Sequence, residues 1–163
     1  MNRQYLVQRW EGTLLSLDSN YLPFGRTQQN LKDFRGAPLS STGKLQGKRF
    51  SEYDFSVSDF KDVWLEDCLF EDSAFCEASF VNVSDHGNQF TRCSFEKTDF
   101  RLTHFGIALT KFEHCALTAP RFERTGFGNP VFSHCEFRNI TVSGRVFGIL
   151  GLLHCRQSLG HHS

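Results

Sequence analysis

Large apolar residues recur at every fifth position along most of the chain. From Phe50 to Phe105 each such position holds Phe or Leu, with the single exception of Asp85. A two-residue insertion lies between Phe105 and Phe112. From Phe112 the spacing of five residues resumes and runs to Phe147, and Val142 is the position before Phe147. A buried helix face would need spacings of three and four, and a strand would need a spacing of two. A period of five predicts neither element.

A second restriction concerns the position two residues before each large one, which is usually small. Examples are Ser58, Ala78, Cys93 and Thr103. The other three positions of each five are mostly polar or charged. We therefore expect two inward and three outward side chains per five residues, in a chain that turns a corner at every fifth residue.

This pattern resembles the pentapeptide-repeat family, whose unit has a small residue, a polar residue, a central Leu or Phe and two further polar residues. The resemblance covers roughly residues 45–149. It implies an all-β fold, a right-handed quadrilateral β-helix with four pentapeptides in each coil. We expect about five to six coils, stacked at the ordinary strand spacing of about 4.8 Å. The predicted parts are an N-terminal cap (1–31), the β-helix (32–149) and a C-terminal cap and tail (150–163).

The coil repeat sorts the large residues into four core columns, one behind each face. The first column holds Phe50, Phe70, Phe90, Phe112, Phe132 and Leu152. The second holds Phe55, Phe75, Phe95, Leu117 and Phe137. The third holds Phe60, Phe80, Phe100, Phe122 and Val142. The fourth holds Leu45, Leu65, Asp85, Phe105, Phe127 and Phe147. The Phe residues are thus assigned to packing and not to a binding site.

The two ends of the repeat need covering, because a solenoid exposes its core there. The apolar segment Val146–Cys155 either closes the last coil or joins two rods. Members of the family often dimerise through this end, so the resemblance leaves a homodimer open. The segment is about half as long as a membrane span, and residues 1–11 lack the apolar core of a secretory signal. We therefore expect no membrane association and a reducing cytoplasm, in which cysteines are thiols.

The charges are segregated, although their sum is zero. Residues 50–85 carry a net charge of −9, against +5 before them and +4 after them. This acidic girdle predicts long-range attraction for a basic or DNA-binding protein partner. A solvated acidic face without a partner is the alternative. The predicted girdle residues are Asp54, Asp59, Asp62, Glu71, Asp72 and Glu77.

The fourth face is where the repeat is broken. Asp85 takes a core slot within Val83–Asn88, and a carboxylate among phenyl rings is costly, so we expect this segment to bulge outward. The two-residue insertion within Gly106–Thr110 lies one coil further, beside the same face. Loops on a rigid scaffold often carry recognition, although bulges are also tolerated wherever solvent allows. The predicted partner-binding residues are Trp64, Glu66, Asp67, Asp85, His86 and His104.

His-Cys pairs recur at 114–115, 134–135 and 154–155, one coil apart. The Cys takes the inward small position and the His points outward from a corner, so the spacing opposes a zinc site. We expect buried, inert thiols and an outward, pH-sensitive histidine column. No metal ligands, cofactor or catalytic residues are predicted, because no nucleophile or phosphate-loop motif is present. We therefore expect no enzyme.

Three functions remain open at the level of the sequence. The first is a non-enzymatic protein-binding module, such as an immunity- or antitoxin-like inhibitor of a basic partner. The second follows from the resemblance, because some pentapeptide-repeat proteins bind type II topoisomerases such as DNA gyrase and act as DNA mimics. Here the acidic belt covers only part of the rod, so the mimicry is incomplete. The third is a structural scaffold. Direct nucleic-acid binding is not favoured, because the basic residues are scattered and lack interleaved aromatic residues.

Overall fold

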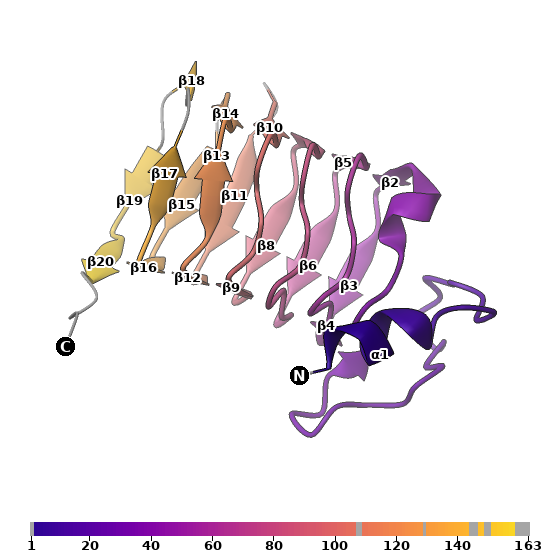
Figure 1. Cartoon of the computed structure of the whole chain (residues 1–163). Coiled ribbons are helices and arrows are strands. Elements are labelled where there is room, and N and C mark those ends of the chain that lie inside the picture. Colours follow the sequence, from indigo (N-terminus) through magenta and orange to yellow (C-terminus); the bar gives the residue numbers. More distant parts are fainter. Residues whose placement is uncertain (1, 107–108, 129, 144–146, 149–150, 159–163) are drawn as a thin grey trace.

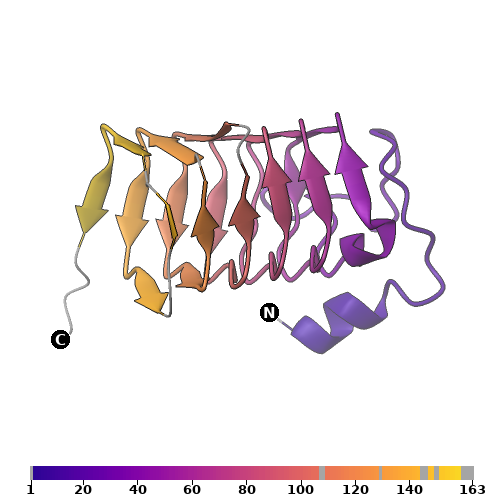
Figure 2. The same ribbon diagram turned by 90° about the horizontal axis from the view of Figure 1, so that it is seen from above.

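The computed structural model describes residues 2–106, 109–128, 130–143, 147–148 and 151–158. The repeat forms a β-solenoid of about five turns, in which the parallel strands of successive coils lie side by side (Figure 1). Seen from above, the coils follow one another along one axis, with the N-terminal segment at one end and the C-terminus at the other (Figure 2). The predicted all-β quadrilateral β-helix is confirmed.

Four faces surround the core, numbered here in the order of the predicted columns. Face 1 contains β3 (Arg49–Ser51), β6 (Leu69–Glu71), β8 (Gln89–Thr91), β11 (Thr110–Glu113), β15 (Pro130–Ser133) and β19 (Gly151–Leu153). Face 2 contains β1 (Lys32–Asp33), β4 (Tyr53–Asp54), β9 (Ser94–Glu96), β12 (Ala116–Thr118), β16 (Glu136–Arg138) and β20 (Arg156–Ser158). Face 3 contains β13 (Arg121–Glu123) and β17 (Thr141–Ser143), continued by isolated bridges. Face 4 contains β2 (Lys44–Gln46), β5 (Trp64–Glu66), β7 (Ser84–His86), β10 (His104–Phe105), β14 (Gly126–Phe127) and β18 (Phe147–Gly148).

Strand pairing follows the predicted coil repeat. Phe50 pairs with Phe70, and Phe70 pairs with Phe90, in parallel register. The insertion lengthens one coil, so that Phe90 pairs with Phe112, and the regular step resumes with Phe132. The predicted ends of the first and third columns are confirmed by the pairing of Phe132 with Leu152 and of Phe122 with Val142.

The predicted end of the fourth column is wrong. Phe127 pairs with Gly148, and Phe147 pairs instead with Gly126, the outward position before it. Gly148 lies six positions after Val142, whereas its partner Phe127 lies five positions after Phe122. Leu152 then lies four positions after Gly148, whereas its partner Phe132 lies five positions after Phe127. The regular period therefore fails locally, although the neighbouring faces keep their register.

The corners explain the period of five. Within the described residues, the residue two positions after a core residue has a positive φ, for example 63° at Asp62, 51° at Asp67 and 62° at Val57. This left-handed conformation is unfavourable for residues with a Cβ, and Asp and Asn adopt it more readily than most others. One such residue in every five turns the chain from one face to the next.

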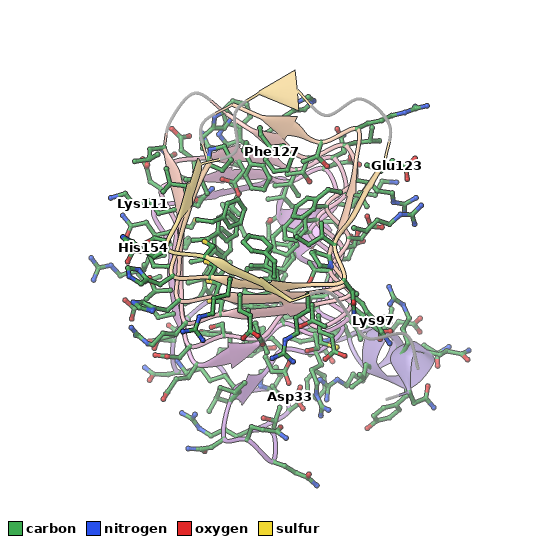
Figure 3. All side chains as sticks on the ribbon, turned by 90° about the vertical axis from the view of Figure 1, so that its left-hand side faces the viewer. Asp33, Lys97, Lys111, Glu123, Phe127 and His154 are labelled. Atoms are coloured by element: carbon green, nitrogen blue, oxygen red, sulfur yellow. The ribbon has the colours of Figure 1, made fainter. Side chains whose placement is uncertain are left out.

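The interior is filled by stacked phenyl rings. Along face 1 the ring centroids of Phe70, Phe90 and Phe112 are 4.8 Å apart at each step, with planes within 8° of parallel. Neighbouring columns meet edge to face, as between Phe70 and Phe75 at 5.5 Å. Burial of each ring contributes about 1.5–3 kcal/mol before the entropy of the chain is counted. Figure 3 looks along the rod and shows rings inside, with Lys111 and other charged groups outside.

The small inward residues also link successive coils. Thr98 Oγ1 donates to the main-chain carbonyl of Phe75 at 2.7 Å, and Thr125 Oγ1 donates to that of Phe100 at 2.9 Å. The Sγ of Cys93 takes the same position toward the carbonyl of Phe70. The sequence indicated lack of space as the reason for small residues here, and hydrogen bonding to the preceding coil is a second reason.

The N-terminal segment covers the first coil. Helix α1 (Arg3–Gln8) is capped by Asn2, and the short 3-10 helix η1 (Leu39–Thr42) precedes β2. Trp10 is buried, with its ring 5.5 Å from Phe34, and its Nε1 donates to the Arg35 carbonyl at 2.9 Å. Among the described residues no helix has the length and apolar character needed to cross a membrane. The predicted limits of the caps and the predicted dimer remain predictions, and most side chains of 146–155 lie outside the described residues.

Candidate functional site

Exposed apolar side chains gather around one face of the rod. Between residues 32 and 140, apart from 107–108 and 129, the large exposed ones are Trp64, Leu102 and Leu109. Trp64 lies on face 4, Leu102 at the corner where the chain enters it, and Leu109 just before β11, where the chain leaves it. Leu102 also lines a groove of about 160 Å³ with Arg101 and Arg124. These three side chains therefore lie on or beside face 4, which runs along the upper edge of Figure 1.

Trp64 is held in a fixed cluster on this face. Its ring stacks on His86, with centroids 4.4 Å apart, and its Nε1 donates to Glu66 Oε2 at 3.0 Å. Lys44 Nζ lies 3.6 Å from the same carboxylate oxygen. The hydrogen bond from Trp64 and the charge of Lys44 lower the pKa of Glu66. Trp64 nevertheless remains 43% exposed, so a partner can reach it without displacing these contacts.

Glycines make room for the two histidines of face 4. A Cβ at Gly106 would lie 2.2 Å from His86 Nδ1, and a Cβ at Gly126 would lie 2.7 Å from His104 Nδ1. Each imidazole therefore lies over the backbone of the next coil. The period of five alone does not assign a role to these glycines. Their spacing from the histidines, one coil further along, was the available signal.

Asp85 is buried, and the predicted outward bulge is wrong. Val83–Asn88 contains the regular strand β7, in which Asp85 pairs with Leu65 below and Phe105 above. Only 2% of Asp85 is exposed, so it cannot itself contact a partner. Burial raises the pKa of its carboxyl from 3.8 to about 6, although hydrogen bonds with Thr110 and Asn88 oppose the rise. A carboxyl that is easily neutralised is much less costly to bury than a fixed charge.

A notch opens at the corner between faces 4 and 1. Its corner column reads Gly47, Asp67 and Gly87, so the Asp67 side chain has no neighbouring corner side chain in the coils on either side. Asp67 is exposed, and it directly follows the Trp64–Glu66 strand. The notch has a volume of about 370 Å³ and is lined by Gly47, Arg49, Asp67, Cys68, Leu69, Gly87 and Gln89.

The acidic girdle is a ring and not a patch. Asp62, Asp67, Asp72 and Glu77 are consecutive corners of the coil and all have positive φ, so they point in four directions. Asp72 is paired with Arg92 at 2.8 Å, and Asp62 accepts a hydrogen bond from Asn82 at 2.7 Å.

Several of the predicted girdle residues are less accessible than expected. Asp54 is only 8% exposed, and its Oδ1 accepts a hydrogen bond from the backbone N–H of Ser56. Asp59 is half-buried and accepts a hydrogen bond from the backbone N–H of Lys61. Glu71 is also half-buried, on face 1. The expectation that Asp54 forms part of the outer acidic surface is wrong, because the start of the solenoid covers it. No flat partner can touch all the girdle residues together.

Of the predicted partner-binding residues, the structure brings Trp64, Glu66 and His86 into contact and places Asp67 at the adjacent notch. His104 is exposed on the same face, one coil beyond His86. Asp85 lies directly behind them in the core. Face 4 with this notch is therefore the candidate site.

Comparison with known proteins adds the following findings. No family model and no curated protein matches the chain. A pentapeptide-repeat protein from the thylakoid lumen of Arabidopsis thaliana is 24% identical with a TM-score of 0.42, over 61% of this chain and 68% of that one. QnrB1, a plasmid-mediated fluoroquinolone resistance protein, is 16% identical with a TM-score of 0.28, over 71% and 82%. Rfr23, from the cyanobacterium Cyanothece 51142, is 10% identical with a TM-score of 0.34, over 71% and 84%.

The repeat of five, the paired coils and the four core columns of this chain decide its fold. The chain has the pentapeptide-repeat fold.

On this pentapeptide-repeat rod the histidines and cysteines form separate columns. The rings of His114, His134 and His154 stack on the outside, with centroids 4.9 and 5.1 Å apart. Cys115 and Cys135 lie inside, and the neighbouring Cys115 thiol and burial raise the pKa of Cys135. Within the described residues, no group of three or more His, Cys, Asp or Glu side chains is arranged to hold a metal ion.

Proposed function

We propose that the chain is a non-enzymatic protein-binding module that holds a basic protein partner against face 4 and its corner notch. One observation carries the proposal: the exposed apolar side chains of the described coils border this single face. Partly exposed Trp residues held in a fixed cluster are typical anchors of protein interfaces. The grooves of about 160 and 370 Å³ on the described part of the rod are open to solvent, which suits contact with a protein better than enclosure of a small substrate.

The charge of the partner follows from the acidic ring. Asp62, Asp67, Asp72 and Glu77 attract a basic protein from any direction, and this raises the rate of encounter. Glu66 and Asp67 lie beside Trp64, so part of that charge is also available for local contact. A cytoplasmic immunity- or antitoxin-like inhibitor of a basic protein fits this combination.

The corners of the ring provide a matched experiment. Asp62→Asn, Asp67→Asn and Glu77→Gln each remove one negative charge from the same coil, but on different sides of the rod. Partner captured from host lysate by the wild-type protein is identified and purified, and its Kd is then measured with each variant. We expect Asp67→Asn to weaken binding several-fold more than the other two, and Trp64→Ala to weaken it most. Equal losses for the three charge variants, or unchanged binding by Trp64→Ala, contradict the proposed site.

A second candidate is a protein that interacts with DNA gyrase as a partial DNA mimic. The specific observation in its favour is the ring itself, because acidic side chains at the four corners of a coil resemble the charge around a duplex, although Arg92 pairs with one of them, Asp72. A supercoiling assay with purified gyrase tests it. Protection or inhibition at micromolar concentrations supports this candidate, and no effect removes it. If neither experiment shows binding, a structural scaffold remains.

A further inference from the structure

The buried cluster behind face 4 departs from the way that the other coils are linked. In the regular arrangement, the hydroxyl two residues before a core Phe donates to a main-chain carbonyl of the preceding coil, as Thr125 does to Phe100. Thr110 occupies this position before Phe112, but its Oγ1 lies 2.5 Å from Asp85 Oδ1, a carboxyl oxygen. The Asp85 main-chain carbonyl accepts the ordinary bond between coils from the backbone N–H of Gly106 at 2.7 Å, as the Phe105 carbonyl does from Gly128.

Because a carboxyl oxygen takes the place of a main-chain carbonyl as the acceptor, this one hydrogen bond between coils depends on a titratable group. A main-chain carbonyl remains a hydrogen-bond acceptor at every pH. A carboxyl group changes its charge with pH and gains an O–H donor when it is protonated. Thr110 is the first residue of β11, directly after the inserted stretch. The link therefore lies at the one place where the coil is two residues longer than the others.

The surroundings of Asp85 favour its neutral form. Leu65 and Phe105 lie directly below and above it, and both are almost fully buried. Inside the core the facing polar groups are the amide of Asn88, the hydroxyl of Thr110 and the thiol of Cys68. The nearest charged or titratable groups on β5, β7 and β10 are on the outward positions of these strands. They are Glu66, His86 and His104.

We infer that Asp85 and Thr110 form a proton-dependent clamp: the enlarged coil is closed most stably when Asp85 is neutral, and it opens more readily when Asp85 is ionised, because the hydrogen bond from Thr110 offsets only part of the cost of the buried charge. An ionised carboxylate in this apolar site is stabilised by water if the coil opens, because two hydrogen bonds do not replace its hydration. Opening costs the bonds on either side of the insertion, from Gly106 N–H to Asp85 and from Lys111 N–H to Asn88. The inference concerns the coil itself and does not depend on the proposed partner.

The direction of the pH effect follows from the raised pKa of Asp85, about 6 against 3.8. Below the unfolded value both states hold a neutral carboxyl, and the contribution to stability is complete. As pH rises through 6, the folded protein must carry a buried charge that the unfolded chain carries in water. The folded-to-unfolded ratio is expected to fall by roughly a hundredfold across this window.

Two measurements on the whole chain test the clamp. The first is the carboxyl titration of Asp85 by carbon NMR, in the wild type, Thr110→Val and Thr110→Ser. We expect a wild-type midpoint near 6, a higher midpoint in Thr110→Val, which loses the hydrogen bond to the ionised form, and recovery in Thr110→Ser. A wild-type midpoint in the usual Asp range overturns the inference.

The second measurement is hydrogen exchange of the Gly106 and Lys111 amides between pH 5 and 7.5, corrected for intrinsic rates. We expect their protection to fall with pH in the wild type and to stay level in Asp85→Asn, which keeps the shape of the side chain without its charge. Asp54→Asn, a second buried carboxyl on face 2, serves as the matched control and is expected to behave as the wild type. The same pH dependence in Asp85→Asn and the wild type overturns the inference.

Discussion

Two buried aspartates, one under the N-terminal segment and one in the third coil, respond to burial in opposite ways. Asp33 receives hydrogen bonds from Arg9 at 2.6 Å and from Arg35 at 2.8 Å. Although burial raises its pKa, the hydrogen bonds from Arg35 and Arg9 hold that pKa well below the usual range. Asp85 has only the neutral partners Thr110 and Asn88, and its pKa rises.

The comparison shows that charged partners can outweigh the cost of burying a carboxyl, whereas neutral partners do not. With two guanidinium groups, Asp33 fastens the N-terminal segment to the first coil as a permanent charge. Without a cation, Asp85 becomes a titratable link between coils. The two aspartates thus give a structural tie at one end of the rod and a pH-sensitive one in the middle.

The largest expected effect comes from breaking the tie at the N-terminal end. Asp33→Ala leaves the buried Arg9 without its carboxylate, and we expect a loss of about 3–5 kcal/mol in the free energy of unfolding. Denaturant unfolding measures it, with the exposed Asp18→Ala as control. A loss below about 1 kcal/mol would show that this ion pair does not hold the segment in place.

The pH dependence of stability separates the two aspartates. The contribution of Asp33 is present above its unfolded pKa near 3.8 and is lost as pH falls below that value. The contribution of Asp85 is present below 3.8 and is lost as pH rises through about 6, by about 3 kcal/mol. Unfolding curves from pH 2.5 to 8 should therefore lose the alkaline decline in Asp85→Asn and keep the acid one. Retention of both declines contradicts the comparison.

A repair of the fourth column should stabilise the rod at neutral pH. Asp85→Leu combined with Thr110→Val gives a continuous apolar column from Leu65 to Phe105 and leaves no hydroxyl without its acceptor. We expect a gain of about 1–3 kcal/mol at pH 7, measured by thermal or denaturant unfolding. The single change Asp85→Leu is the control, because it leaves Thr110 unsatisfied. A less stable double variant would mean that the cluster contributes more than its charge costs.

The smallest effect on stability is expected at the candidate site. Trp64→Ala removes an exposed ring that contacts His86 and Glu66, and we expect the free energy of unfolding to change by about 0.5 kcal/mol or less. Binding of the partner should nevertheless be lost. A large loss of stability would indicate that Trp64 belongs to the packing of the coils and not to an interface.

Most of the fold could be predicted from the sequence, because a period of five leaves few alternatives. The phenyl columns at Phe50, Phe70 and Phe90 follow directly from it. The corner ring was also within reach, since Asp62, Asp67 and the two corners after them are five residues apart.

Three features could not be predicted for physical reasons. The cost of a buried charge argued for a bulge at Asp85, but the pairing of its strand on both sides, with Thr110 as hydrogen-bond partner, kept the residue inside. The displaced register of Phe147 depends on how the neighbouring faces pair, and the period alone does not contain this information. The contact between Trp64 and His86 is set by side-chain rotamers, which a spacing does not determine.

The left-handed corners have one more consequence. Because every corner repeats in line with the corners of the coils before and after it, the outside of the rod is a set of straight rows with the spacing of neighbouring strands, about 4.8 Å. Any group introduced at matching corners is displayed in such a row at fixed intervals, as His114, His134 and His154 already are. The rod can therefore serve as a molecular ruler on which charges or reactive groups are set at chosen intervals without disturbing the phenyl interior.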